Sequence, residues 1–348
     1  MTTESSLKEL LPPEYQDLEW YDNSALSTID RCLRKGYWKN IFPLTITEAL
    51  ATAPQATTEV VYKGLSEKMG NGAFYGSAIH AGLDRLYSPI NANKTLEQRR
   101  ILMLRAFTSK YMELFSDPEM VENKYSMDRG LDVLDMYVDH YQEIDQYFKV
   151  IDTELVMINV IRPEKGDNDF VPFIYIARSD GLIQRLQFDD YHILEHKNVV
   201  SVDQEMNKLR IGRQGEGYVW SAKQFPTTMD YPITGILANI LAVRAAESEP
   251  SKLFFRDFIP KTSYHTEQWR IETIRKVERW RALIKESSQE QTIVGQMLTF
   301  DRTTEECTRY GLCSFYDLCM HGPHSVDLSK YTPNTWNPLY TEKVETDD

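Results

Sequence analysis

Apolar positions recur at helical spacing through the first half of the chain. Within residues 70–87, a glycine turn precedes Ile79, Leu83 and Leu86, which fall on one face of a helix. An earlier helical pattern begins at a Ser or Thr cap near residue 27. A loop-rich stretch that ends near Met69 separates this pattern from the helix over residues 70–87. The chain therefore predicts four helices, over residues 27–38, 70–87, about 97–117 and about 130–147. The later ones are typical of a helical insert or lid.

The pattern changes at Val150, where short apolar runs lie between turn residues. This change predicts a meander of four strands, over residues 154–161, 171–177, 181–188 and 191–200. A helix, two further strands and a long charged helix are expected next, over residues 213–225, 232–243, 253–259 and 267–288. The mixture of helices and strands predicts an α/β fold, and the chain shows no internal repeat.

Composition indicates a soluble protein with a substantial core. Hydrophobic residues make up 42% of the 348 residues and aromatic residues 11%. The longest near-continuous apolar run, Ile233 to Val243, is shorter than the roughly 20 residues that a bilayer requires. The first residues carry no signal-peptide pattern. We therefore expect a cytoplasmic location, or the host cytoplasm if the protein is viral, and no membrane partner.

The net charge of −13 disfavours indiscriminate phosphate binding, so any nucleic-acid site must be local. The basic residues available for such a site are Arg31, Arg34, Lys35, Lys208, Arg210, Arg213 and Lys223, with Arg270, Arg275, Lys276, Arg279, Arg281 and Lys285 on the long helix. For the long helix, we favour an ordinary solvated face. Unpaired bases could stack on the aromatic rings of Tyr218, Trp220 and Phe225. Aromatic residues at helical spacing, however, more often pack in the hydrophobic core.

Two acids and a lysine form the most informative group in the sequence. Asp180 is expected at the turn into one strand. Glu195 and Lys197 are two positions apart on the next strand, so both leave the sheet on one face and His196 points the other way. A turn near Asp189 would pair the two strands in antiparallel fashion and bring Asp180 and Glu195 together across the ladder.

This group suits the hydrolysis of phosphodiester bonds. Mg²⁺ and Mn²⁺ prefer oxygen ligands, and an ion held by Asp180 and Glu195 would polarise a phosphoryl oxygen and lower the pKa of an attacking water. Lys197 would orient that water and offset the charge that develops on phosphorus. The alternative is a surface hairpin with charged alternate positions. The apolar residues on both sides of the group favour catalysis, because buried charges are costly unless they pair or bind metal.

Six residues follow one another in an order that several nucleases share: His80, Asp180, Glu195, Lys197, Gln214 and Tyr218. This order resembles the PD-(D/E)XK nuclease superfamily, specifically the RecB-like branch that includes the AddB nuclease domain, CRISPR-associated adaptation nucleases and phage exonucleases. The resemblance implies one elaborated domain with a restriction-endonuclease-like core, in which a mixed central sheet is flanked by helices. Its parts would be a helical segment with Cys32 and His80, the nuclease core, a C-terminal helix with an iron–sulfur segment, and a tail, over residues 20–149, 150–260, 261–324 and 325–348.

The resemblance also implies a role for each of these residues. The expected metal ligands are His80, Asp180, Glu195 and the backbone carbonyl of His196. Lys197 would be the catalytic lysine, and Gln214 and Tyr218 would lie near the active site, on DNA or on the lysine. Taken singly, a histidine on a helix and two residues four positions apart have ordinary structural explanations. Glu154 is a minor acidic candidate.

The four cysteines are Cys32, Cys307, Cys313 and Cys319. A reducing cytoplasm disfavours disulfides, and the wide spacing of the last three differs from the close pairs of structural zinc sites. A 4Fe–4S cluster suits four such thiolates, although spacing alone leaves zinc or four buried apolar thiols open. The RecB-like resemblance implies the 4Fe–4S cluster, because its clustered members use one cysteine before the core and three after it. In the commonest form, two of those three are closer together than here.

Together, these features predict a Mg²⁺- or Mn²⁺-dependent DNA exonuclease of the PD-(D/E)XK type. It would act on single-stranded or duplex ends in recombination, repair or phage DNA metabolism. The chain lacks a GxxxxGK[ST] phosphate loop, which argues against an ATP-driven motor and leaves room for a helicase, recombinase or integrase partner, or for a homo-oligomer. Two alternatives are a non-catalytic DNA-binding or scaffold subunit and a structure-specific endonuclease.

Overall fold

The computed structural model describes residues 12–41, 43–45, 61–63, 65, 70–115, 121–163, 170–309 and 311–331 of the chain. Most of the loop-rich stretch predicted before Met69 lies outside these residues, as does the tail from residue 332 onward. One short 3-10 helix, Pro323–Ser325, ends at the first residue of the predicted tail, and a second, Leu328–Lys330, lies within it.

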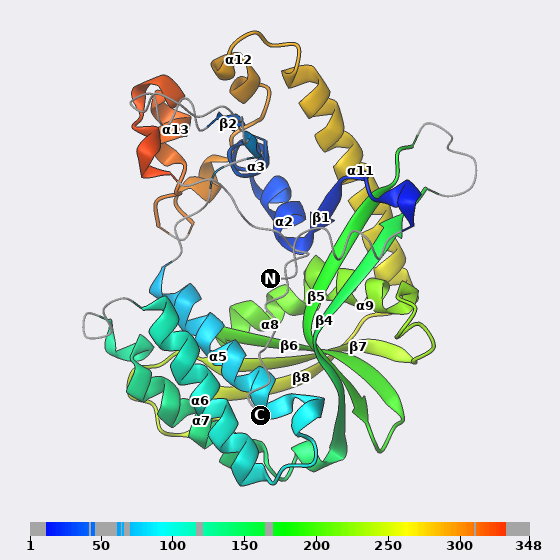
Figure 1. Cartoon of the computed structure of the whole chain (residues 1–348), viewed down its shortest axis with the longest axis vertical. Coiled ribbons are helices and arrows are strands. Elements are labelled where there is room, and N and C mark those ends of the chain that lie inside the picture. Colours follow the sequence, from blue (N-terminus) through cyan, green and yellow to red (C-terminus); the bar gives the residue numbers. More distant parts are fainter. Residues whose placement is uncertain are drawn as a thin grey trace. The chain divides into compact units, whose positions relative to one another are not determined.

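A six-stranded mixed sheet flanked by helices confirms the predicted α/β class (Figure 1). The strand order is β1-β5-β6-β7-β8, and β4 pairs with β5 outside this path. β1 is parallel to β5, β6 is antiparallel to β5, β7 is parallel to β6, and β8 is antiparallel to β7. The strands are β1 (Trp20–Asp22), β4 (Phe148–Ile161), β5 (Phe173–Arg185), β6 (Asp190–Val199), β7 (Ile233–Ala242) and β8 (Phe254–Pro260). A separate antiparallel ladder joins β2 (Pro43–Thr45) and β3 (Val61–Lys63).

β5 is one continuous strand, so the prediction of two strands separated by a turn at Asp180 was wrong. Ser, Asp and Gly are common turn residues, and their succession at positions 179–181 suggested a break. In the structure this segment is extended, and Gly181 meets a packing need instead. A Cβ atom at Gly181 would lie 2.8 Å from the backbone oxygen of Asp152 on β4. The glycine therefore lets two backbones pass closely at the position next to Asp180.

β7 lies between β6, to which it is parallel, and β8, to which it is antiparallel. Its sequence, ITGILANILA, is buried at nine of ten positions, as expected of a strand covered on both faces. The parallel pairing of β6 with β7 requires a crossover, which α8 (Val202–Ile211) and α9 (Arg213–Gln224) provide. The sequence predicted α9 but not α8, which buries only Met206 and Leu209.

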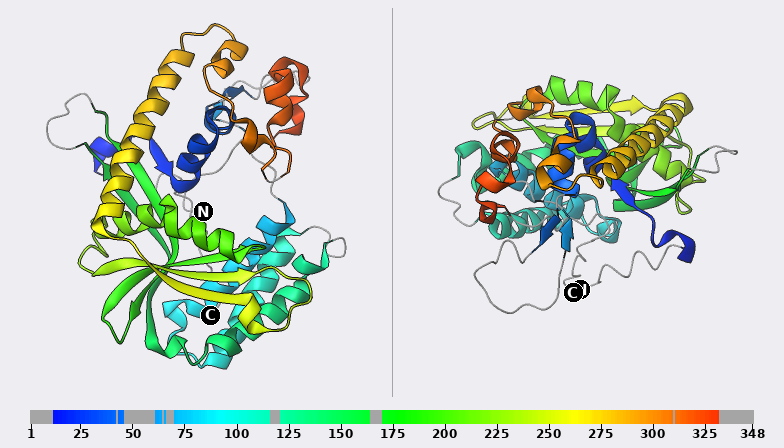
Figure 2. Two further views of the ribbon diagram at one scale, coloured as in Figure 1. Left: turned by 180° about the vertical axis from the view of Figure 1, so that it is seen from behind. Right: turned by 90° about the horizontal axis from the view of Figure 1, so that it is seen from above.

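Three helices of the predicted insert form a layer: α5 (Asn71–Tyr87), α6 (Leu96–Leu114) and α7 (Met127–Tyr141). They lie side by side in both Figure 1 and Figure 2. Their buried faces share one apolar cluster with Leu241 of β7 and Phe254 of β8, so these helices are part of the core and not a lid. At Gly130 of α7, a Cβ atom would lie 2.0 Å from the ring of Phe107, which shows how closely α6 and α7 approach.

The chain divides into two compact units. One comprises Met1–Lys68, Val160–Ile176 and Ile271–Asp348, and the other comprises Met69–Asn159 and Ala177–Arg270. β4, β5 and the long helix α11 (Ser263–Ser287) each contain residues of both units. The second unit contains every predicted active-site residue, and the first contains all four cysteines.

In the first unit, the predicted helix over residues 27–38 is instead two helices, α2 (Asn23–Arg31) and α3 (Leu33–Asn40). Cys32 stands between them with an extended backbone and a buried side chain. On α3, the ring of Tyr37 stacks on Phe300 with centroids 5.0 Å apart, and Phe300 also packs against Trp280. The remaining helices of this unit include α12 (Ile293–Leu298) and α13 (Tyr316–His321). None of the helices in the described part of the chain is both long and apolar enough to cross a bilayer.

Candidate active site

The antiparallel ladder between β5 and β6 brings the two predicted acids together. Its paired residues run from Arg185 opposite Asp190 to Gly181 opposite Leu194, so the next step places Asp180 opposite Glu195. The connection contains Asp189 in the left-handed region, with φ of 52°, close to the predicted turn. The meeting of the two acids thus follows directly from the register of one hairpin.

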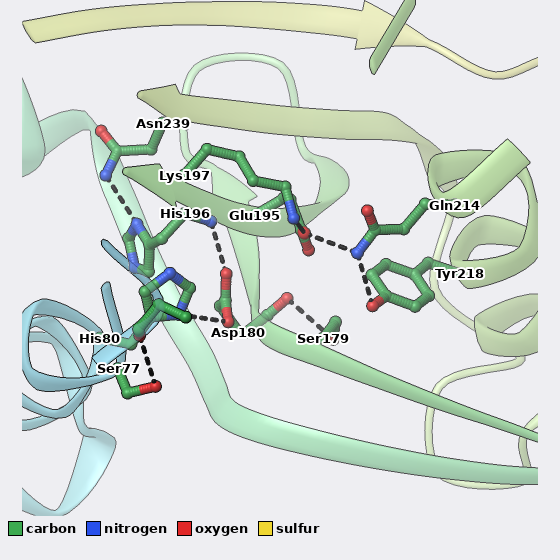
Figure 3. A network of polar contacts seen from close by, with 12 residues as sticks. Ser77, His80, Ser179, Asp180, Glu195, His196, Lys197, Gln214, Tyr218 and Asn239 are labelled. Carbon is green, nitrogen blue, oxygen red and sulfur yellow. Dashed lines mark hydrogen bonds and ion pairs between the residues drawn. The ribbon is translucent and has the colours of Figure 1, made fainter. Parts of the chain in front are cut away.

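Asp180 accepts hydrogen bonds at both of its carboxylate oxygens (Figure 3). His80 Nδ1 lies 3.1 Å from Oδ1, and the backbone N–H of His196 donates to Oδ2. His80 comes from α5, two turns before the end of that helix, where the predicted helical face lies. The Asp180 side chain therefore joins α5 to the strand that carries Glu195.

Glu195 and Lys197 form an ion pair on β6, as their two-residue spacing predicted. The Glu195 side chain is almost fully buried, whereas Lys197 retains 24% of its side-chain exposure. Lys197 therefore compensates the buried carboxylate from the solvent side.

Gln214 and Tyr218 both lie on α9, one helical turn apart. Gln214 Nε2 donates to Glu195 Oε1 over 2.7 Å and to the hydroxyl of Tyr218 over 2.8 Å. This contact, visible in Figure 3, fixes the orientation of the Glu195 carboxylate. The sequence places these residues near the active site, on DNA or on the lysine. In the structure Gln214 contacts the Glu195 carboxylate and Tyr218 contacts Gln214, and their roles toward DNA and the lysine stay predictions.

The side chain of His196 leads away from Glu195, as the alternation of the strand predicted. Its Nδ1 lies 2.6 Å from the Asn239 amide nitrogen, and Asn239 in turn accepts from Arg256 Nε over 2.8 Å. The ring of Tyr87 stacks on His196. Asn239 and Arg256 are site neighbours that the sequence analysis missed, because their strands, β7 and β8, were recognised by apolar content alone. The metal-binding role of the His196 carbonyl stays a prediction.

Burial and neighbouring charges shift the titration of the whole group. Burial alone would favour neutral Asp180, but His80 holds the pKa of Asp180 well below its ordinary value. The same contact raises the pKa of His80 against the effect of burial. Burial, together with the charge of Asp180, raises the pKa of Glu195, while Glu195 raises the pKa of Lys197 against burial. The two acids are thus near enough to repel each other and depend on nearby cations.

Glu154 of β4 adds a third acid near this group. Protein atoms around its carboxyl, and then the charges of Asp180 and Asp84, raise the pKa of Glu154 to about 7, although the side chain keeps contact with solvent. The backbone at Glu154 has a φ of 50°, in the left-handed region. Glu154 was a minor candidate from the sequence. Asp84 was not a candidate, but it lies four positions after His80 on α5 and so shares its helix face.

No family model matches this chain, and no match was found among curated proteins.

The donor set of the site suits a hard divalent cation. Asp180 and Glu195 offer carboxylate oxygens, and His80 offers a ring nitrogen beside them, which is a set that Mn²⁺ and Mg²⁺ accept. Among the described residues, no three His, Cys, Asp or Glu side chains converge in the arrangement of a bound metal ion. Instead, His80 contacts the Asp180 carboxylate and Lys197 contacts the Glu195 carboxylate. These two contacts offset the negative charge that a bound cation would otherwise offset.

All four cysteines are free thiols in the first unit. Burial raises the pKa of Cys319 to about 11, against a hydrogen bond from the Trp38 indole N–H at 3.2 Å, and the nearby Cys32 and Cys313 add to the rise. Burial likewise raises the pKa of Cys313, and the neighbouring Cys307 and Cys32 contribute. Cys319 thus lies within electrostatic reach of Cys32 and Cys313, and Cys313 within reach of Cys307 and Cys32. The shared 4Fe–4S cluster stays a prediction.

Three of the six basic candidates on the long helix have acidic partners. Arg270 pairs with Glu267, Lys276 with Asp30 and Arg281 with Glu19, as the interpretation of a solvated, ion-paired face expects. Among the aromatic candidates for base stacking, Trp220 is buried, with its ring centroid 5.4 Å from that of Trp269. Tyr218 is buried as well. These two rings therefore belong to the core.

Proposed function

We propose that this protein is a Mg²⁺- or Mn²⁺-dependent DNA exonuclease of the PD-(D/E)XK superfamily, with a restriction-endonuclease-like core and a structural 4Fe–4S cluster. The observation that carries the proposal is the register of β5 and β6, which sets Asp180 against Glu195 beside Lys197. Processing of DNA ends in recombination, repair or phage replication fits this activity.

Each residue of the site has a chemical task in this proposal. Asp180 and Glu195 present hard oxygen donors from neighbouring strands, and His80 adds a third donor. When bound, a divalent cation supplies Lewis-acid activation of the phosphate and of the attacking water. Lys197 brings a positive charge to the point where negative charge develops on phosphorus. Gln214 keeps the Glu195 carboxylate in one orientation.

The cysteines support a structural role for the cluster. Cys32 sits at the junction of α2 and α3, and the other three lie between residues 307 and 319, so a shared cluster would join segments 275 positions apart. Closing so long a loop has an entropy cost of about 5 kcal/mol, which metal binding must offset. The Trp38 N–H directed at Cys319 is a hydrogen bond of the kind that tunes cluster sulfurs.

Digestion of end-labelled linear oligonucleotides with Mn²⁺, after anaerobic purification, tests the proposed activity. We expect wild-type protein to release labelled product, and Glu195→Gln and Lys197→Met each to lose about 10²-fold or more in rate. Glu143→Gln is the matched control, because Glu143 is exposed and has no side-chain partner among the described residues. Hydrolysis that survives Glu195→Gln would refute the assignment of the site.

The substrate form separates this proposal from its two alternatives. An exonuclease degrades linear DNA and leaves covalently closed circles intact, whereas a structure-specific endonuclease cuts closed branched substrates. A scaffold subunit would retain DNA without hydrolysis at any Mn²⁺ concentration. Intact Asp180, Glu195 and Lys197 argue against the scaffold, because an unused site gains nothing from an acid and an amine in an apolar strand.

A further inference from the structure

A pocket of about 810 Å³ lies within the second unit, and two neighbours of the acidic site, Tyr87 and Arg256, are among the residues that line it. Its floor includes Leu194 of β6 and Leu237 of β7, which pair with each other in the parallel ladder. Leu194 precedes Glu195, so the pocket and the Glu195 side chain lie on opposite faces of the sheet. The end of α5, the beginning of α6 and the end of α7 supply much of the rest of the lining.

Aliphatic and aromatic side chains make up most of the pocket wall. Ile183, Leu194 and Leu237 form a small buried cluster, against which Phe148 and Val150 of β4 pack. All five line the pocket. A volume of this size with a largely apolar wall, into which polar side chains also project, is the usual form of a site for a small organic molecule.

The charged side chains of the lining give the pocket an excess of positive charge. They are Arg99, Asp145, Lys149 and Arg256. Asp145 and Arg256 form an ion pair with each other, and Arg256 also donates to the hydroxyls of Tyr87 and Tyr137, so this pair is compensated.

Arg99 and Lys149 are the uncompensated cations. Neither side chain forms a hydrogen bond or an ion pair with another residue in the described ranges. The Nε of Arg99 is buried without a partner, which is costly for a charged donor. Arg99 is half-buried, whereas Lys149 is exposed where it lines the pocket. Together they place positive charge beside an apolar wall in a protein of net charge −13, which makes a local site for negative charge.

We propose that this pocket binds an organic anion with an apolar body, such as a medium-chain carboxylate. The aliphatic wall would hold the chain, and Arg99 and Lys149 would hold the anionic head. A nucleotide fits less well, because most of the wall offers no hydrogen-bond partner for a base. The proposal does not depend on the proposed nuclease activity, and its test measures binding alone.

Calorimetric titration of the full-length protein with dodecanoate, below its critical micelle concentration, tests the site. We expect saturable binding with one site per chain. Dodecanol, which lacks the charge, should bind at least about tenfold more weakly, and dodecylamine should not compete. Arg99→Gln combined with Lys149→Gln should weaken dodecanoate binding at least about tenfold. Arg105→Gln, an exposed cation of the same helix outside the pocket, should leave it unchanged.

A second variant keeps the test informative if the double variant folds poorly. Ala92 is exposed at the edge of the pocket, so Ala92→Trp should fill its entrance without disturbing the core and should abolish dodecanoate binding. Equal affinity for dodecanoate and dodecylamine would overturn the proposal. Absence of binding up to the solubility limit would overturn it as well, and so would unchanged affinity in both variants.

Discussion

At the scale of single residues, the buried carboxylate of Glu195 is the most costly feature of the site. It is 4% exposed, and burying a carboxylate destabilises the fold unless charges and hydrogen bonds compensate it. Lys197 and Gln214 provide that compensation. Such an arrangement is expected where a buried acid must remain ready to bind a cation.

Gln214→Ala should raise the Mn²⁺ concentration needed for half-maximal binding by about tenfold or more, because the Glu195 carboxylate loses the donor that orients it. Calorimetric titration with Mn²⁺ measures this change. Gln224→Ala is the control, since Gln224 is an exposed glutamine at the end of the same helix. An affinity equal to that of wild type would show that Gln214 does not orient the acid.

The raised pKa of Glu154 predicts how the stability of the fold depends on pH. Its pKa is raised in the folded protein from an ordinary 4.5 to about 7, so its protonated form contributes stability below pH 4.5 that is lost as the pH rises to about 7. Without metal, Glu154→Gln should be more stable than wild type at pH 8, by about 1 kcal/mol after allowance for solvent screening. The difference should vanish at pH 4.

Thermal unfolding of both proteins in EDTA across this pH range measures the effect. Glu143→Gln, at an exposed position, should follow the wild-type curve. A constant difference between Glu154→Gln and wild type from pH 4 to pH 8 would contradict the raised pKa.

At the scale of elements, the position of Asp180 depends on how closely β4 and β5 pass. Gly181→Ala would place a Cβ atom 2.8 Å from the backbone oxygen of Asp152, and backbone cannot move aside as a side chain can. We expect a loss of about 1–3 kcal/mol in the free energy of unfolding. Chemical denaturation measures it.

For the control variant, Gly76→Ala, we expect a change in the free energy of unfolding of the opposite sign. At Gly76, inside α5, the nearest atom to a new Cβ is 3.9 Å away, so Gly76→Ala should be neutral or stabilising by up to about 1 kcal/mol. Equal stability of Gly181→Ala and wild type would show that the two strands are free to separate.

Periodicity in the sequence was enough to find the elements that carry the site. Helix α5, strand β6 and helix α9 each have a clear apolar pattern, and they position His80, Glu195 and Gln214. The sequence pattern gave wrong element boundaries where the local residue types favour a conformation that the folded chain does not adopt. Ser179 and Gly181 are turn formers placed in an extended strand, and Cys32 interrupts a segment that otherwise reads as one helix. In both places, contacts with distant residues outweigh local preference.

Contacts between segments far apart in the chain could not be predicted from the sequence. Nothing in the pattern of β8 indicates that Arg256 bonds to Asn239, which in turn bonds to the ring of His196. Helix α8 has only two buried residues, too few to mark its apolar face clearly. The pairing of Asp180 with Glu195 was predictable because one hairpin determines it.

At the scale of the whole molecule, the two units separate the two proposed metal centres. The first unit contains the cysteines and the second contains the acidic site. Loss of the cluster should therefore loosen the cysteine-bearing helices while the local geometry of the hairpin persists.

Cys313→Ala should lose the visible absorbance of an iron–sulfur chromophore and lose hydrogen-exchange protection in α2, α3 and α13 together, because the cluster would join these segments. Protection of β6 and α9 should change little. Ser314→Ala, the adjacent position, is the control. A protein that as purified contains zinc, or no metal, would contradict the proposed cluster without affecting the acidic site.

In the proposed active site, Asp180 and Glu195 together hold one divalent cation. Titration of metal-free protein with Mn²⁺, followed by electron paramagnetic resonance, tests it directly. We predict one bound ion per chain at the acidic site, with affinity reduced about 10²-fold by either Asp180→Asn or Glu195→Gln and unchanged by Glu143→Gln. Binding of Mn²⁺ with wild-type affinity by either of the two carboxylate variants would show that the two acids do not hold an ion together.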